Sequence, residues 1–140
     1  MVENVGSGIN SSEVPLSPEA ELKRVQQQIK EYYYQPDMSL ERLDAVRAYT
    51  ADMMNEVLFK DKPKELKRSK DAIQQRAEKD TVFGEELGRV TKFADELNIA
   101  VAATSVSEFD RFNTVFDFLS RDIWADRERQ IMSTAMNKQK

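Results

Sequence analysis

The chain has 140 residues, of which 40% are hydrophobic and 33% charged, and its formal net charge is −4. It contains no cysteine and no histidine, which excludes disulfides, thiolate or imidazole metal sites, and Ser-His-Asp catalysis within one chain. Glycine and proline number only four each, too few for the turns of a sandwich or barrel, so we expect an all-α fold of helical hairpins or a bundle.

Residues 1–16 are rich in Ser, Asn, Gly and Val without periodicity, which predicts a flexible N-terminal arm. The apolar residues in it leave open a second interpretation, an arm that orders on a neighbouring subunit. The start lacks a basic segment followed by an apolar stretch, and no run of about 18 apolar residues occurs, so no secretion signal or membrane span is predicted. We expect a location in the cytoplasm or in a macromolecular assembly, virions included.

Residues 17–59 are expected to form an N-terminal helical hairpin. Ser17 is a good N-cap before Pro18, and apolar residues then recur at helical spacing until the residue before Pro36 ends the helix. A second helix opens at Ser39 with its own apolar stripe. The connection between the two helices is short, which favours antiparallel neighbours.

Residues 60–70 are the most basic stretch and are expected to form a linker and the start of the next helix. Lysine and arginine at a helix N-terminus oppose the helix dipole, so they are not there to stabilise the helix. Two interpretations remain, a solvated surface or a contact patch for nucleic acid or another anionic partner. The candidate contact residues are Lys60, Lys62, Lys64, Lys67, Arg68 and Lys70.

The third helix is expected to be long, from about residue 63 to 97, because no proline interrupts it. Its apolar positions step by four and three, as in a coiled coil. These positions are Phe83, Leu87, Val90, Ala94 and Leu97. The first half of this seam is polar, so tight packing is expected only after Thr81. We interpret residues 98–106 as the connection to the last helix, and residues 71–140 as one long helical hairpin.

Gly84 and Gly88 lie one turn apart inside the expected long helix. Each costs roughly 1 kcal/mol of helix stability relative to alanine. Two glycines at this spacing favour the close approach of another helix, because small residues lower the steric barrier between backbones. Simple tolerance or a local kink is the alternative.

The last helix is expected to start after the N-cap Ser107 and to run to about residue 137. Its apolar residues up to Ile123 cover about half of the helix circumference at 100° per residue, which is wide for one neighbour. Trp124 falls outside this arc, and Ile131 continues on its side. We therefore predict contact with a second chain, the alternative being that the first two helices cover this face. The residues predicted to contact a partner are Phe112, Phe116, Phe118, Trp124, Ile131, Gly84 and Gly88.

Carboxylate pairs such as Glu85-Glu86 and Asp95-Glu96 are interpreted as solvated helix surface. The chain carries no calcium loop and no phosphate-binding glycine loop, so we predict no catalytic residue, no metal and no cofactor, and hence no enzyme.

These patterns favour a helical protein that self-associates or binds helical partner proteins as a structural or assembly component. A nucleic-acid-associated protein is the first alternative. In the order of its expected elements, small N-terminal helices before a long helical hairpin, the chain resembles the ring-forming small subunits of phage DNA packaging. That resemblance covers the order of elements and transfers no residues. The second alternative is an adaptor or chaperone for one specific partner.

Overall fold

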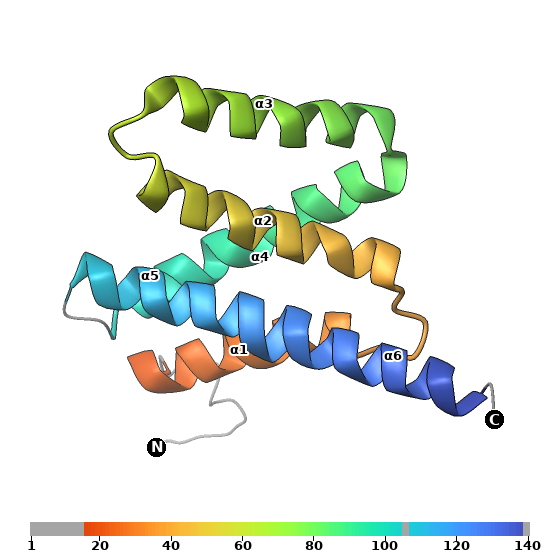
Figure 1. Cartoon of the computed structure of the whole chain (residues 1–140). Coiled ribbons are helices and arrows are strands. Elements are labelled where there is room, and N and C mark those ends of the chain that lie inside the picture. The colour runs from red at the N-terminus through yellow and green to blue at the C-terminus, as the bar shows by residue number, and fades with distance from the viewer. Residues whose placement is uncertain (1–15, 105–106, 139–140) are drawn as a thin grey trace, which may run out of the picture.

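A computed structural model describes residues 16–104 and 107–138, and every regular element in these ranges is a helix (Figure 1). The all-α prediction is confirmed for this part of the chain. In chain order the elements are α1 (Pro18–Tyr33), α2 (Leu40–Leu58), α3 (Pro63–Lys79), α4 (Thr81–Ala102), α5 (Glu108–Asp117), the π-helix η2 (Phe118–Ala125) and α6 (Asp126–Lys138). The predicted N-terminal arm lies outside the described residues except for Leu16, which is exposed.

Serine caps begin three of the helices as predicted. The side chain of Ser17 accepts the Ala20 N–H, and that of Ser39 accepts the Arg42 N–H. Ser107 does the same for the first turn of α5. Such caps satisfy amide groups that have no partner within the helix, and each stabilises by about 1 kcal/mol.

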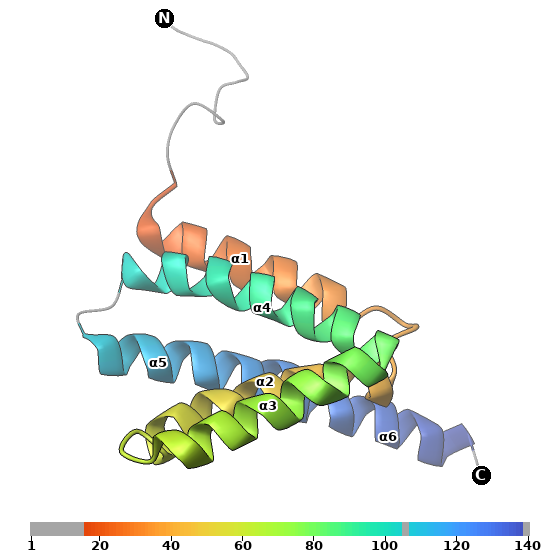
Figure 2. The same ribbon diagram turned by 90° about the horizontal axis from the view of Figure 1, so that it is seen from above.

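Helix α4 is the centre of the molecule, because it packs against α1, α2, α3 and α5. Figure 2 shows α1 beside α4 on one side and α2 beside α3 on the other, with α5 between them. The largest fully buried side chains are Ile29, Tyr33, Leu43, Val46, Phe83, Val90, Leu97, Val101, Val115, Leu119 and Ile123. Helix α1 thus packs mainly on α4, and the expected hairpin of α1 with α2 is not one of the main contacts.

The prediction of one long third helix is wrong. Asp80 is extended, with φ −117° and ψ 104°, and its side chain caps α4 by accepting the Phe83 N–H. The chain therefore turns at Asp80, between α3 and α4. Helix α3, which precedes this turn, lies alongside α2 (Figure 1). A straight helix would leave Leu66 and Ile73 in water, whereas the turn half-buries both. The expected connection at 98–106 also begins later, because α4 continues to Ala102.

Polar contacts hold α3 in place, because none of its side chains is fully buried. The Arg76 guanidinium lies 2.6 Å from the Asp44 carboxylate of α2 and 3.8 Å from the centre of the Phe83 ring of α4. Nearer the start of α3, the Asn55 amide donates to the Ser69 hydroxyl at 2.7 Å.

The two glycines of α4 differ in what surrounds them. A methyl group at Gly84 would lie 2.5 Å from the Ala77 carbonyl oxygen, whereas one at Gly88 would meet nothing within 4 Å. Gly84 therefore lets α3 approach α4 at the corner. The close approach predicted for this glycine occurs within the chain itself.

Replacing each glycine by alanine separates these two environments. Gly84→Ala should lower the free energy of unfolding by about 1–3 kcal/mol, because the added methyl group overlaps backbone. Gly88→Ala should raise it by about 0.5–1 kcal/mol, because alanine is the better helix former. Urea denaturation followed by circular dichroism measures both variants. Equal effects of the two substitutions would contradict the corner packing.

Candidate functional site

The last three helical segments, α5, η2 and α6, form one unbroken helix with a π-helical middle. The Asp126 N–H donates to the Arg121 carbonyl, five residues earlier. A π turn holds more residues than an α turn, so the side chains beyond it face another direction than 100° spacing predicts. Trp124 and Ile131 consequently lie half-buried against the core of their own chain. Their contact with a second chain stays a prediction for the parts that remain exposed.

Two side chains fix the start of α6 to the end of α1. The Tyr34 hydroxyl donates to the Asp126 carboxylate at 2.8 Å and also contacts the Asp122 carbonyl, which in an α-helix would accept the Asp126 N–H. The Arg127 guanidinium donates to the Tyr33 carbonyl at 2.9 Å and to the carbonyl of Gln35 at 2.7 Å. A cation at this position also interacts favourably with the negative, C-terminal end of the α1 dipole.

The aromatic residues of the last helix divide into two groups. Phe118 is only 4% exposed and belongs to the core, so its prediction as a partner contact is corrected. Phe112 and Phe116 are half-buried and stack on each other, with ring centroids 5.7 Å apart. Phe109, one turn before them, is 73% exposed. These three rings form an aromatic row on α5.

The end of α6 projects beyond the rest of the molecule. In Figures 1 and 2 it extends past the loop that joins α1 to α2. Met132 and Met136 lie one turn apart on this end, 49% and 63% exposed, and Ala135 beside them is exposed as well. We call Met132, Ala135 and Met136 the α6 tip. Methionine side chains are flexible and adapt to irregular partner surfaces.

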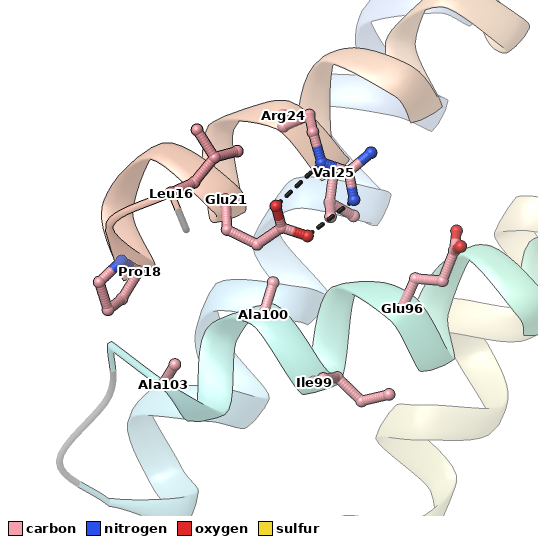
Figure 3. Close-up of a pocket in the computed structure, with 9 residues that line it drawn as sticks. All are labelled: Leu16, Pro18, Glu21, Arg24, Val25, Glu96, Ile99, Ala100 and Ala103. Atoms are coloured by element: carbon pink, nitrogen blue, oxygen red, sulfur yellow. Dashed lines mark hydrogen bonds and ion pairs between the residues drawn. The ribbon is translucent and has the colours of Figure 1, made fainter. Parts of the chain in front are cut away.

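An apolar groove of about 400 Å³ lies between the start of α1 and the end of α4 (Figure 3). We call it the α1–α4 groove; its apolar lining consists of Leu16, Pro18, Val25, Ile99, Ala100 and Ala103. Ile99 is 75% exposed, whereas Val25 and Ala100 are buried. Charged side chains stand beside it, the bidentate pair of Glu21 with Arg24 and the exposed Glu96. The groove has no signature in the sequence, because one wall comes from residues 16–25 and the other from residues 96–103.

The basic stretch is divided by its position on α3. The Lys70 ammonium faces α2 and lies 3.1 Å from Asp52 and 3.2 Å from Glu56, so its charge is used within the chain. Lys67 pairs with Asp71 one turn later at 2.8 Å. The remaining four predicted contact residues are exposed and have no ion pair within the described part of the chain. They are Lys60, Lys62, Lys64 and Arg68.

Glu86 was interpreted as solvated surface, and this is wrong, because it is 6% exposed. It accepts the Tyr32 hydroxyl at 2.7 Å and the Arg42 guanidinium at 3.3 Å, and Arg42 also donates to the Tyr32 oxygen at 2.7 Å. Burial, followed by the bond to Glu86, raises the pKa of Tyr32. The cluster joins α1, α2 and α4. Its signal in the sequence was the position of Glu86 between Phe83 and Val90, at core spacing.

Among the described residues, no group of three or more acidic side chains is arranged to hold a metal ion. Within the same ranges, no helix combines the length and the apolar character needed to cross a membrane.

The contact between Tyr34 and Asp126 predicts a pH dependence. The Tyr34 hydrogen bond, followed by that of Arg129, lowers the pKa of the Asp126 carboxyl. A pKa lower in the folded than in the unfolded state means that the contact stabilises above the unfolded pKa, near 4, and that this stabilisation is lost as the pH falls through the folded pKa. Tyr34→Phe should raise the pKa of Asp126, as followed by carboxyl NMR titration.

Tyr49→Phe is the matched control, since Tyr49 lies on α2 and makes no hydrogen bond to Asp126. An unchanged Asp126 pKa in Tyr34→Phe would contradict the anchoring of α6 by this hydroxyl.

Comparisons of the chain with protein-family models, with curated proteins and with solved structures found no match.

Proposed function

We propose that this chain is a non-enzymatic assembly protein that binds further copies of itself through the end of α6. The observation that carries the proposal is the exposure of Met132 and Met136 on a helix end that projects past the other helices. A short helical stretch that packs on nothing is marginal in water, because most helix stability in proteins comes from packing an apolar face. A second chain would supply that packing.

The anchoring of α6 supports contact between chains rather than within one chain. Tyr34 and Arg127 hold the start of α6 to the end of α1, and the helix is unbroken from there to its end. The α6 tip therefore has no hinge by which to fold back onto its own core. Covering both methionines by a partner stabilises by roughly 25 cal/mol for each Å² of apolar surface removed from water.

Self-association is tested by light scattering over a range of concentrations. The wild-type mass should exceed that of one chain and fall on dilution. Met136→Asp should weaken association by about 2 kcal/mol, the scale of an interface hot spot, because it would bury an unpaired charge. Leu58→Asp is the matched control, since Leu58 is 64% exposed against 63% for Met136 and both stand near a helix C-terminus.

A wild-type chain that stays monomeric at every concentration would reject self-association. An adaptor that binds one specific partner would then be the better interpretation of the same surface. Equal weakening by Met136→Asp and Leu58→Asp would show that the added charge acts without regard to position.

We propose nucleic-acid binding as the alternative function. It is favoured by the outer face of α3, where Lys64, Lys67 and Arg68 line a shallow groove. Lys60 and Lys62 precede this face and are exposed. Phosphate groups are the natural counterions for such a row, and binding through them depends on charge rather than on base sequence.

This alternative predicts an affinity for duplex DNA that falls steeply with salt, with a slope of about −0.9 in log K against log salt for each phosphate neutralised. Reversing Lys64, Lys67 and Arg68 to glutamate should abolish binding, as followed by fluorescence anisotropy. Reversing Lys23, Lys30 and Lys92, which are exposed elsewhere, changes the net charge equally and should leave most of the binding in place. Equal loss in the two triple variants would reject α3 as the contact face.

A further inference from the structure

The molecule carries two exposed apolar features at opposite ends. The α1–α4 groove lies where α1 starts and α4 ends, and the α6 tip lies at the other end of the molecule in both views (Figures 1 and 2). We infer that the α6 tip of one copy binds in the α1–α4 groove of the next copy, so that the chains associate head to tail. This inference rests on the proposed self-association and specifies the two surfaces that meet.

The shapes of the two surfaces are complementary. The groove is hollow because alanines stand at positions 100 and 103, where longer side chains would fill it, and its floor is the buried pair Val25 and Ala100. The α6 tip has the opposite shape, because the exposed side chains of Met132 and Met136 project from the helix one turn apart. Long flexible side chains opposite small ones allow two helices to approach closely and fill the space between them.

The charges around the two surfaces are also complementary. Arg24 is engaged by both carboxylate oxygens of Glu21, and the exposed Glu96 has no ion pair with the residues that the structure describes. Arg129 stands three residues before Met132 and seven before Met136, on the same face of α6. Its side chain is 73% exposed and makes one hydrogen bond, to Asp126 at 2.8 Å. An exposed ion pair of this kind is weak, so Arg129 can exchange Asp126 for Glu96 when the α6 tip enters the groove. Opposite charges at the rim favour this pairing.

Because the two surfaces differ, one contact leaves a free groove on one copy and a free α6 tip on the other. Such a heterologous contact continues until it closes into a ring or extends as a filament. It also separates this arrangement from a two-fold dimer, in which the same patch of both copies would meet.

Two single variants test the inference, one on each surface. Ile99→Asp changes the groove at a residue that is 75% exposed, and Met136→Asp changes the α6 tip. Each variant alone should raise the dissociation constant at least ~10-fold in light scattering, while Leu58→Asp should not. In a mixture, the intact α6 tip of the Ile99→Asp chain meets the intact groove of the Met136→Asp chain. The mixture should therefore form one-to-one dimers and nothing larger.

The absence of cysteine from the chain permits a second measurement. Chains carrying Ile99→Cys, mixed with chains carrying Met136→Cys, should form disulfide-linked pairs under mild oxidation, with each cysteine on a different chain. Chains carrying Leu58→Cys, mixed with either, should not. Each single-cysteine variant incubated alone should give far less crosslinking than the mixture.

Four outcomes would overturn the inference. Wild-type chains that stay monomeric would reject it together with the proposed self-association. Wild-type chains that assemble while Ile99→Asp assembles equally well would reject the groove and keep self-association. Failure of the two Asp variants to pair in a mixture would do the same. Efficient crosslinking of the Met136→Cys chain with itself would indicate contact between two α6 tips.

Discussion

The contact between the end of α1 and the start of α6 determines where the last helix leaves the molecule. Arg127 donates to carbonyl groups of Tyr33 and Gln35, at the end of α1 and just beyond it, and Tyr34 binds Asp126 from the same place. These partners are 92 to 94 residues apart along the chain. Without them, the apolar contacts of η2, which include Trp124, and of the half-buried Ile131 would orient α6. The direction of its exposed end, and hence its availability to another chain, depends on this polar junction.

The two sides of the molecule are held together by different forces. Around α4 the contacts are mostly apolar, with the Glu86 cluster as the polar exception, and they lie out of water. Helix α3 is instead attached by ion pairs and one amide–hydroxyl bond at the surface, where water and salt weaken electrostatic attraction. Helix α3 has no fully buried side chain, and it also carries the exposed basic residues Lys64, Lys67 and Arg68.

The predictable parts of the fold were those governed by local chemistry. Serine caps at Ser17, Ser39 and Ser107 marked true helix starts, and the scarcity of glycine and proline correctly indicated an all-α chain. The break at Asp80 was missed because the residue reads as an ordinary polar position in a helix, and its role as a cap appears only once α3 packs on α2. Gly84, one helical turn after Asp80, was the feature of the local sequence that indicated a close approach of α3 and α4.

The candidate surfaces show the same division between local and distant information. The change in the apolar face near Ile123 was visible in the sequence, and its cause is the π-helical geometry of η2, which a wheel of constant 100° steps does not represent. The burial of Phe118 and of Glu86 depends on which helices lie opposite, so spacing alone could not assign it. The α1–α4 groove needs two distant segments side by side and has no signature in either one.

The π segment also has a consequence for how such a chain tolerates changes in its length. Its wider turn accommodates about one residue more than an α-helix covering the same distance, so a chain shortened by one residue within 118–125 could become α-helical throughout. Residues after the deletion would keep their direction relative to the core, because the residue removed is the one that the wider turn accommodates. Conversion of the segment to an α-helix without a deletion would instead rotate Met132 and Met136 by about 100° relative to the core. A single codon in this segment could thus be lost without redirecting the end of the molecule.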